Sequence, residues 1–183
     1  MAAGATYEPI ATATLSSNGS FSFTSIPTGY GNLVLHMTNK GTSNGQMIVR
    51  INNDSSGTAY IGTQMYSSGS SVASSTYDFL PGFYSGSTSS SYEAFQRFYF
   101  PNYDNSYMYK SMIGFGGTRE QVVTGVFTYK STSAINRIDI LGNGYDITTP
   151  GAEYGFGGEG GAVQYYSLTT LSQTTWTGSI GSA

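Results

Sequence analysis

The chain has 183 residues, of which seven are lysine or arginine and ten are aspartate or glutamate, so its formal net charge is −3 at pH 7. Charged residues make up 9% of the sequence, against about 25% in a typical soluble domain. The basic residues are scattered one at a time, which argues against a nucleic-acid partner, because tracking a phosphate backbone needs clustered positive charge. The absence of cysteine excludes disulfides, thiolate nucleophiles and cysteine-bound metals.

The beginning of the chain predicts an arm rather than a targeting signal. Residues 1–8 are small and weakly patterned, and Pro9 follows them. They lack the positive start and the apolar stretch of a signal peptide, and no segment of the sequence reaches eighteen consecutive apolar residues. We therefore expect no membrane partner and a protein made in the cytoplasm, whose arm becomes ordered on another protein.

Alternating apolar residues predict strands along most of the chain. The first clear runs are Phe21 with Phe23, then 33–37, then 47–51, and each has the period of two that keeps one face of a strand apolar. With the weaker runs included, the predicted strands are 9–16, 20–25, 31–38, 46–53, 58–66, 93–100, 107–115, 121–130, 134–140 and 162–170.

No stretch of the sequence favours a helix. The best candidate is residues 92–100, where Phe98 and Phe100 alternate until Pro101 ends the run, which is the pattern of a strand. The sequence therefore predicts a single all-β domain over residues 9–183, an antiparallel β-sandwich of roughly 8–10 short strands. Its predicted core contains Phe21, Phe23, Leu33, Leu35, Val49 and Ile51.

Two segments, residues 67–91 and 141–161, are predicted to be long loops, and loops of such length in a compact domain usually carry function. The first is rich in serine and holds an aromatic cluster over residues 77–84, while the second is rich in glycine. Tyrosine is a low-entropy anchor in protein interfaces and also stacks on sugars. The candidate interface residues are Tyr7, Arg50, Tyr77, Phe79, Phe83, Tyr84 and Tyr154.

The residue types needed for catalysis are sparse. His36 is the single histidine, and since a zinc site or a serine–histidine–aspartate triad needs further partners, we interpret it as an outward or inter-subunit strand residue. The acidic residues are spread over the chain, which leaves a glycosidase pair of carboxylates open as an alternative. We predict no enzyme activity, no cofactor and no metal.

Three further motifs have simple structural interpretations. Residues 52–57 offer oxygen ligands without the spacing of a calcium loop, which favours an Asx turn. The Gly-Phe-Gly-Gly runs at 114–117 and 155–158 lack the lysine of a phosphate loop. Arg50 points away from the apolar face of its strand, as either a solvated edge residue or a clamp on a carboxylate at a strand end or subunit contact.

The order of motifs over residues 8–66 carries a resemblance. A Ser-Ile-Pro-Thr-Gly-Tyr corner at 25–30 precedes an aliphatic Leu-Val-Leu-His-Met run at 33–37 and an Arg-Ile-Asn-Asn-Asp strand end at 50–54. This order resembles the small jelly-roll virion accessory proteins of tailed bacteriophages, which include head decoration (cement) proteins and tail-fibre types. The resemblance implies a jelly-roll fold and a structural role in the virion, and it brings no catalytic residue.

Two functional hypotheses follow from the resemblance and the composition. The first is a capsid decoration protein, located in the virion, that binds and stabilises the head lattice through the major capsid protein or another virion protein. The alternative is a receptor-binding tail-fibre or tip domain whose aromatic segment 77–84 recognises a host surface glycan. Both hypotheses imply a homotrimer, since both kinds of protein tend to occupy three-fold positions.

Overall fold

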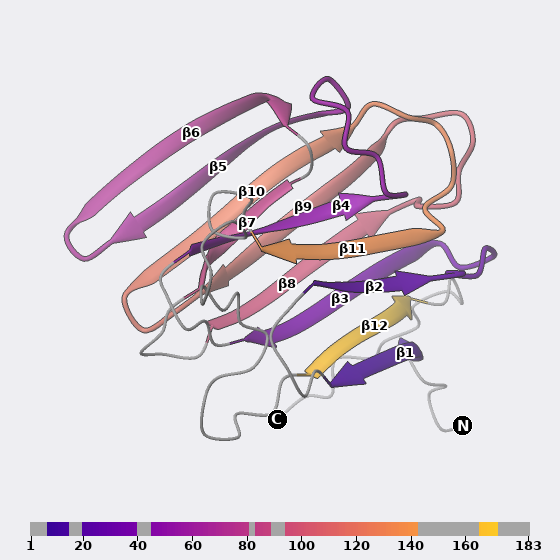
Figure 1. Ribbon diagram of the computed structural model, residues 1–183, viewed down its shortest axis with the longest axis horizontal. Helices are drawn as coiled ribbons and strands as arrows, with labels where there is room; N and C mark the ends of the chain where they lie inside the picture. The colour runs from indigo at the N-terminus through magenta and orange to yellow at the C-terminus, as the bar shows by residue number, and fades with distance from the viewer. Residues whose placement is uncertain are drawn as a thin grey trace, which may run out of the picture.

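The computed structural model describes residues 7–14, 20–39, 45–80, 83–88, 94–142 and 165–171. Within these ranges the chain forms twelve strands and no helix. The strands form two antiparallel sheets that pack against each other (Figure 1). The predicted all-β sandwich is therefore confirmed, with two strands more than the sequence indicated, and jelly-roll connectivity stays a prediction.

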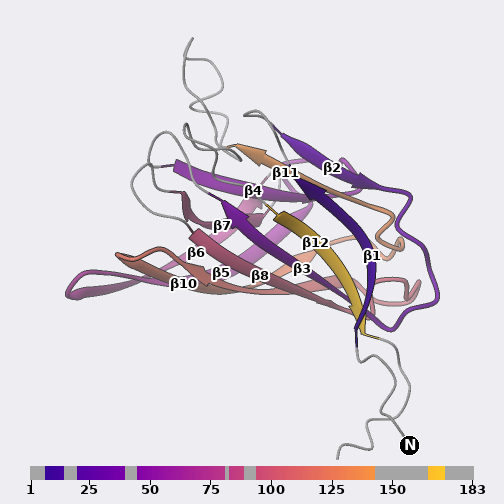
Figure 2. The same cartoon turned by 90° about the horizontal axis from the view of Figure 1, so that it is seen from below.

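The larger sheet contains eight strands. Their order is β1 (Tyr7–Thr14), β12 (Tyr165–Leu171), β3 (Asn32–Asn39), β8 (Ala94–Pro101), β9 (Lys110–Gly117), β10 (Gln121–Tyr129), β5 (Tyr60–Ser68) and β6 (Ser71–Leu80). β12 lies between β1 and β3, so strands from the two ends of the chain complete one edge of this sheet (Figure 2).

The smaller sheet contains four strands and covers one face of the larger sheet (Figure 2). Their order is β2 (Phe21–Thr24), β11 (Arg137–Gly142), β4 (Gly45–Ile51) and β7 (Phe83–Thr88). β11 therefore lies between β2 and β4 and pairs with both. It comes more than 80 residues after β4 in the chain.

The core between the sheets contains the residues that alternation predicted. Phe23, Leu33, Leu35, Val49 and Ile51 are buried, and Phe21 is partly buried and packs against them. Ring–ring contact supports this edge of the core, since the Phe21 and Phe23 centroids lie 4.8 Å apart in an edge-to-face arrangement. The predicted inward face of these three strands is therefore confirmed.

The prediction of a loop over residues 67–91 was wrong. β6 and β7 lie within it, and both are edge strands of their sheets. None of the β6 side chains that the structure describes is fully buried, so the apolar alternation that marks a strand with one dry face is missing there. The aromatic segment 77–84 accordingly ends β6 and begins β7, and so connects the larger sheet to the smaller one.

The other predicted loop and the arm are described only in part. Leu141 and Gly142 belong to β11, and residues 143–161 lie outside the described residues. β1 begins at Tyr7, whose register partner is Leu171 of β12, so the last two residues of the predicted arm belong to the sheet. Residues 1–6 of the arm lie outside the described ranges.

Candidate interaction surfaces

Among the side chains that the structure describes, eight large apolar ones are exposed on the outer face of the larger sheet, which points away from the smaller sheet. They are Ile61 and Met65 on β5, Val72 on β6, Phe95 on β8, Ile113 and Phe115 on β9, and Val122 and Val126 on β10. We call this set the apolar sheet face. The exposed fraction runs from 41% for Ile61 to 75% for Val72, whereas the outer face of a solvated sandwich is normally polar.

Strand register brings these side chains together. Val126 of β10 lies directly opposite Ile113 of β9. On the neighbouring pair, Arg97 of β8 lies opposite Phe115, and the ring centroids of Phe95 and Phe115 are 6.4 Å apart. Because direct cross-strand neighbours have Cβ atoms ~5 Å apart, the apolar sheet face is continuous across β8, β9 and β10.

On the inner side of the same strands, glycines leave room for large core rings. A Cβ atom at Gly114 of β9 would lie 2.7 Å from the Phe98 ring. At Gly62 of β5 it would lie 2.0 Å from the Phe127 ring. The core therefore uses glycine beneath large rings, and the Gly-Phe-Gly-Gly run at 114–117 is a strand segment with a packing role.

The border strands of the apolar sheet face carry its nearest charges. On β6, Asp78 lies opposite Ile61. His36 of β3 lies opposite Arg97 of β8, and the His36 and Phe95 rings are 6.3 Å apart. Burial and the neighbouring Arg97 charge lower the pKa of His36, which favours the neutral imidazole. His36 is partly exposed on the outer face, as the sequence predicted.

A second surface feature is the loop of residues 102–109 between β8 and β9, which we call the tip loop. It presents Tyr107, Met108 and Tyr109, with 92%, 49% and 59% of their surfaces exposed. The loop is tied to its surroundings, since the backbone N–H of Asn102 donates to Asn32 Oδ1 at 3.1 Å. The sequence predicts a strand over 107–115, but β9 begins only at Lys110, so the prediction was wrong for 107–109.

Lys110 holds the tip loop through hydrogen bonds to backbone carbonyl groups. Its side chain is fully buried, and Nζ donates to the carbonyl oxygens of Met108 and Thr132, each at 2.9 Å, and to that of Asn105. Burial lowers the pKa of Lys110, while nearby Asp104 opposes that shift. Three backbone acceptors around one ammonium group hold the exposed aromatic tip in place.

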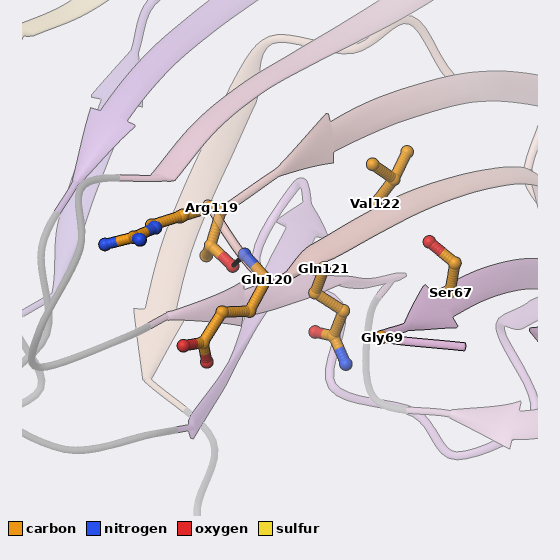
Figure 3. A pocket seen from close by; sticks show the side chains of 7 residues that line it. Ser67, Gly69, Arg119, Glu120, Gln121 and Val122 are labelled. Atoms are coloured by element: carbon orange, nitrogen blue, oxygen red, sulfur yellow. Dashed lines mark hydrogen bonds between the residues drawn. The ribbon is translucent and has the colours of Figure 1, made fainter. Parts of the chain in front are cut away.

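A shallow polar hollow lies between the turns of the β5–β6 and β9–β10 hairpins (Figure 3). It has a volume of about 590 Å³ and is lined by residues that include Ser67, Arg119 and Glu120. Figure 3 shows the Arg119 and Glu120 side chains projecting in different directions from the turn. A ligand site normally has polar groups that converge on one point, so this hollow lacks the arrangement of a binding pocket.

Of the predicted interface residues, the structure describes the side chains of Tyr77 and Arg50. Tyr77 is partly buried, stacks on Phe127 with centroids 6.5 Å apart, and accepts a hydrogen bond from Gln64 Nε2 at 2.6 Å. The ring therefore packs against the core, and a role of Tyr77 in an interface stays a prediction. Tyr7, Phe79, Phe83 and Tyr84 lie on strands, with side chains outside the description, and Tyr154 lies outside the described residues altogether.

Arg50 lies directly opposite a carboxylate. Its register partner across β4 and β11 is Asp139, which is 1% exposed. Asp139 Oδ1 accepts hydrogen bonds from Ser22 Oγ at 2.5 Å and from Arg137 Nε at 2.7 Å. β11 thus places a carboxylate opposite Arg50, as the prediction of a contact between Arg50 and a carboxylate requires. A contact of Arg50 with another subunit stays a prediction.

The turn after β4 matches its predicted form. The backbone N–H of Ser56 donates to Asp54 Oδ1 at 2.9 Å, which is an Asx turn. Asn52 and Asn53 hold positive φ angles of 52° and 56°, a region that asparagine tolerates. Within the described ranges, no group of three or more histidine and acidic residues could hold a metal ion.

No family model matches the chain, and no curated protein matches it. No helix that could cross a membrane occurs in the part of the chain that the structure describes. Fold and surface together define the class as a two-sheet antiparallel β-sandwich with an exposed apolar sheet face and a fastened aromatic tip.

Sequence reasoning missed the apolar sheet face, although a signal for it was present. Adjacent apolar pairs occur on two of its strands, namely Met112 with Ile113 on β9 and Val122 with Val123 on β10. Because successive residues of a strand point to opposite faces, such pairs indicate apolar side chains on both sides of the sheet.

Proposed function

We propose that this protein is a structural component of a tailed-phage virion, a decoration protein that binds the capsid lattice and acts through protein contacts rather than catalysis. The observation that carries the assembly role is the apolar sheet face, because a contiguous exposed apolar patch usually marks a protein–protein contact. The proposal of a tailed-phage virion rests on the motif order over residues 8–66, which resembles that of phage accessory proteins. We further propose a homotrimer, the state expected at three-fold lattice positions.

The tip loop is the surface that we assign to the particle. Tyr107 and Tyr109 are exposed, and the Lys110 hydrogen bonds hold the backbone around them, so binding would require little further ordering of the backbone. Tyrosines placed in this way are frequent hot spots of interfaces. The arm before Tyr7 is a second proposed contact with the particle, by strand addition or arm exchange at the adjoining β1 edge.

Binding to particles stripped of the protein tests this function. Replacing both tyrosines of the tip loop (Tyr107→Ala with Tyr109→Ala) should weaken binding at least tenfold, which corresponds to about 1.4 kcal/mol. Lys130→Ala, which removes a surface ion pair with Asp78, serves as the control and should bind like the parent. Failure of the parent protein to bind stripped particles would refute the decoration role.

The exposed tyrosine pair also favours one alternative, a receptor-binding fibre or tip domain, because tyrosine rings stack on sugars. The number of copies per virion separates the two functions. Quantitative mass spectrometry should find on the order of hundreds of copies for a decoration protein, since it follows the repeats of the lattice. A fibre-type component would be present in far fewer copies and would bind surface glycan from the host.

A further inference from the structure

The apolar sheet face is wide enough for a stable subunit contact. It spans five strands, β8, β9, β10, β5 and β6, which at ~4.8 Å spacing gives a width of ~24 Å. Along β10 it runs from Val122 to Thr128, the partner of Ile61, or ~23 Å at ~3.3 Å per residue. The product of the two lengths is a flat area of ~550 Å². The accessible surface is larger because side chains project from the sheet, so it approaches the ~800 Å² that each partner buries in a standard interface.

The chemistry of this face suits a copy of itself. None of its eight side chains is charged. The ionisable groups beside them lie on the border strands, His36 and Arg97 at the β8 side and Asp78 at the β6 side, opposite Ile61. In a symmetric oligomer the same residues recur on every subunit, so a charged face would repel its own copies. Contacts with unlike partners usually draw specificity from complementary charge, which these eight side chains do not offer.

We propose that the apolar sheet face is the contact between copies of this chain, and that three copies turn this face toward a common three-fold axis. The inference deepens the proposed function, on which it rests for the number of subunits. It places the aliphatic and aromatic side chains of β5, β8, β9 and β10 in the centre of the trimer, and it leaves the tip loop free to contact the particle.

The width of the sheet fits this arrangement. Seven of the eight side chains lie on four adjacent strands, a width of ~19 Å at ~4.8 Å per strand. Three faces of that width, joined as an equilateral triangle, have midpoints ~5.5 Å from the axis. Packed sheets lie ~10 Å apart, so each contributes a side-chain layer of ~5 Å. Three such layers would fill the centre of the triangle without a channel.

Mass measurement of the full chain by light scattering tests the inference. The parent should have three times the 19.4 kDa chain mass, and a double change at the centre of the face, Phe115→Asp with Val126→Asp, should give single chains. Both side chains are about half exposed, so far-UV circular dichroism should remain unchanged. Tyr107→Asp with Tyr109→Asp is the matched control, since it adds the same two charges at the exposed tip loop and should leave the trimer intact.

A parent of one chain mass at micromolar concentration, a double variant that stays trimeric, or a dimer would each overturn the proposal. If the double variant does not fold, the photoreactive analogue p-benzoylphenylalanine in place of Phe115 gives a second measurement. Illumination should cross-link the chain to its own copies, and recovery of uncross-linked chain alone would contradict the inference.

Particle binding separates this inference from the proposed function. A monomeric parent that binds stripped particles, and loses this binding when Phe115 and Val126 are replaced by aspartate, would assign the face to the particle and overturn self-association. A trimer that is broken by the same double change but never binds particles would support the inference and refute the decoration role.

Discussion

The hydroxyl group of Tyr60 hydrogen-bonds to both backbone polar groups of Ile51. It accepts from the Ile51 N–H at 3.0 Å and lies 3.1 Å from the Ile51 carbonyl oxygen, while the Asp54 carbonyl lies 2.9 Å away. Ile51 ends β4 and Tyr60 begins β5. One buried tyrosine therefore joins the smaller sheet to the larger one and closes the turn between them, and its burial raises its pKa.

Replacing Tyr60 with phenylalanine should lower the free energy of unfolding by about 1–3 kcal/mol, because the buried N–H of Ile51 would lose its partner. The ring itself would keep its stacking on Tyr129, where the centroids are 5.0 Å apart. Urea unfolding measures the difference. Tyr107→Phe, at a residue that is 92% exposed, should unfold like the parent, and equal midpoints for both variants would contradict the assigned role of Tyr60.

Lys110→Met should destabilise the tip loop and the domain. The change leaves three backbone carbonyls without the ammonium group that they share, and an unsatisfied buried acceptor costs about 1–3 kcal/mol. Chemical denaturation gives the stability, and limited proteolysis at 102–109 reports on the loop. The matched control is Lys130→Met, whose exposed ion pair with Asp78 contributes about 0–1 kcal/mol. An unchanged rate of cleavage in Lys110→Met would refute the fastening role.

Gly114→Ala should cost about 1–3 kcal/mol, since the added methyl group would lie 2.7 Å from the buried Phe98 ring. A double-mutant cycle with Phe98→Leu provides the control. The smaller side chain makes room for the methyl group, so the two losses together should be less than the sum of the separate ones. If the two losses were strictly additive, contact with the Phe98 ring would not be the reason that position 114 requires glycine.

The stability of the protein should fall as the pH drops below 6.5, the ordinary pKa of histidine. Burial and Arg97 lower the pKa of His36 in the folded state, so the unfolded chain binds a proton first and is favoured by acid. This contribution is complete above pH 6.5 and is lost as the pH falls toward the lower pKa of the folded state. Thermal unfolding at fixed protein concentration should show a weaker pH dependence for His36→Asn than for the parent; identical curves between pH 7.5 and 5 would contradict the prediction.

Local patterning was sufficient for much of the fold. Phe23, Leu35 and Val49 were placed in the core from period-two alternation alone, because a strand with one dry face must repeat in this way. The Asx turn at Asp54 was also predicted, since its hydrogen bond joins residues two apart. For the candidate interface residues, the sequence rightly placed Arg50 off the apolar face, but it did not show that the Tyr77 ring packs inward on Phe127.

The sequence by itself thus determined that the chain is a β-sandwich and which face of its clearest strands is dry, because both follow from residues close together in the chain. Only the tertiary structure decided that serine-rich β6 is a strand, since its order comes from hydrogen bonds to β5 rather than from its own side chains. It also decided that Val122 and Phe115 lie exposed. Alternation shows that two faces differ, but which face is covered depends on where the other sheet packs, and that is set by pairings between distant strands such as β4 and β11.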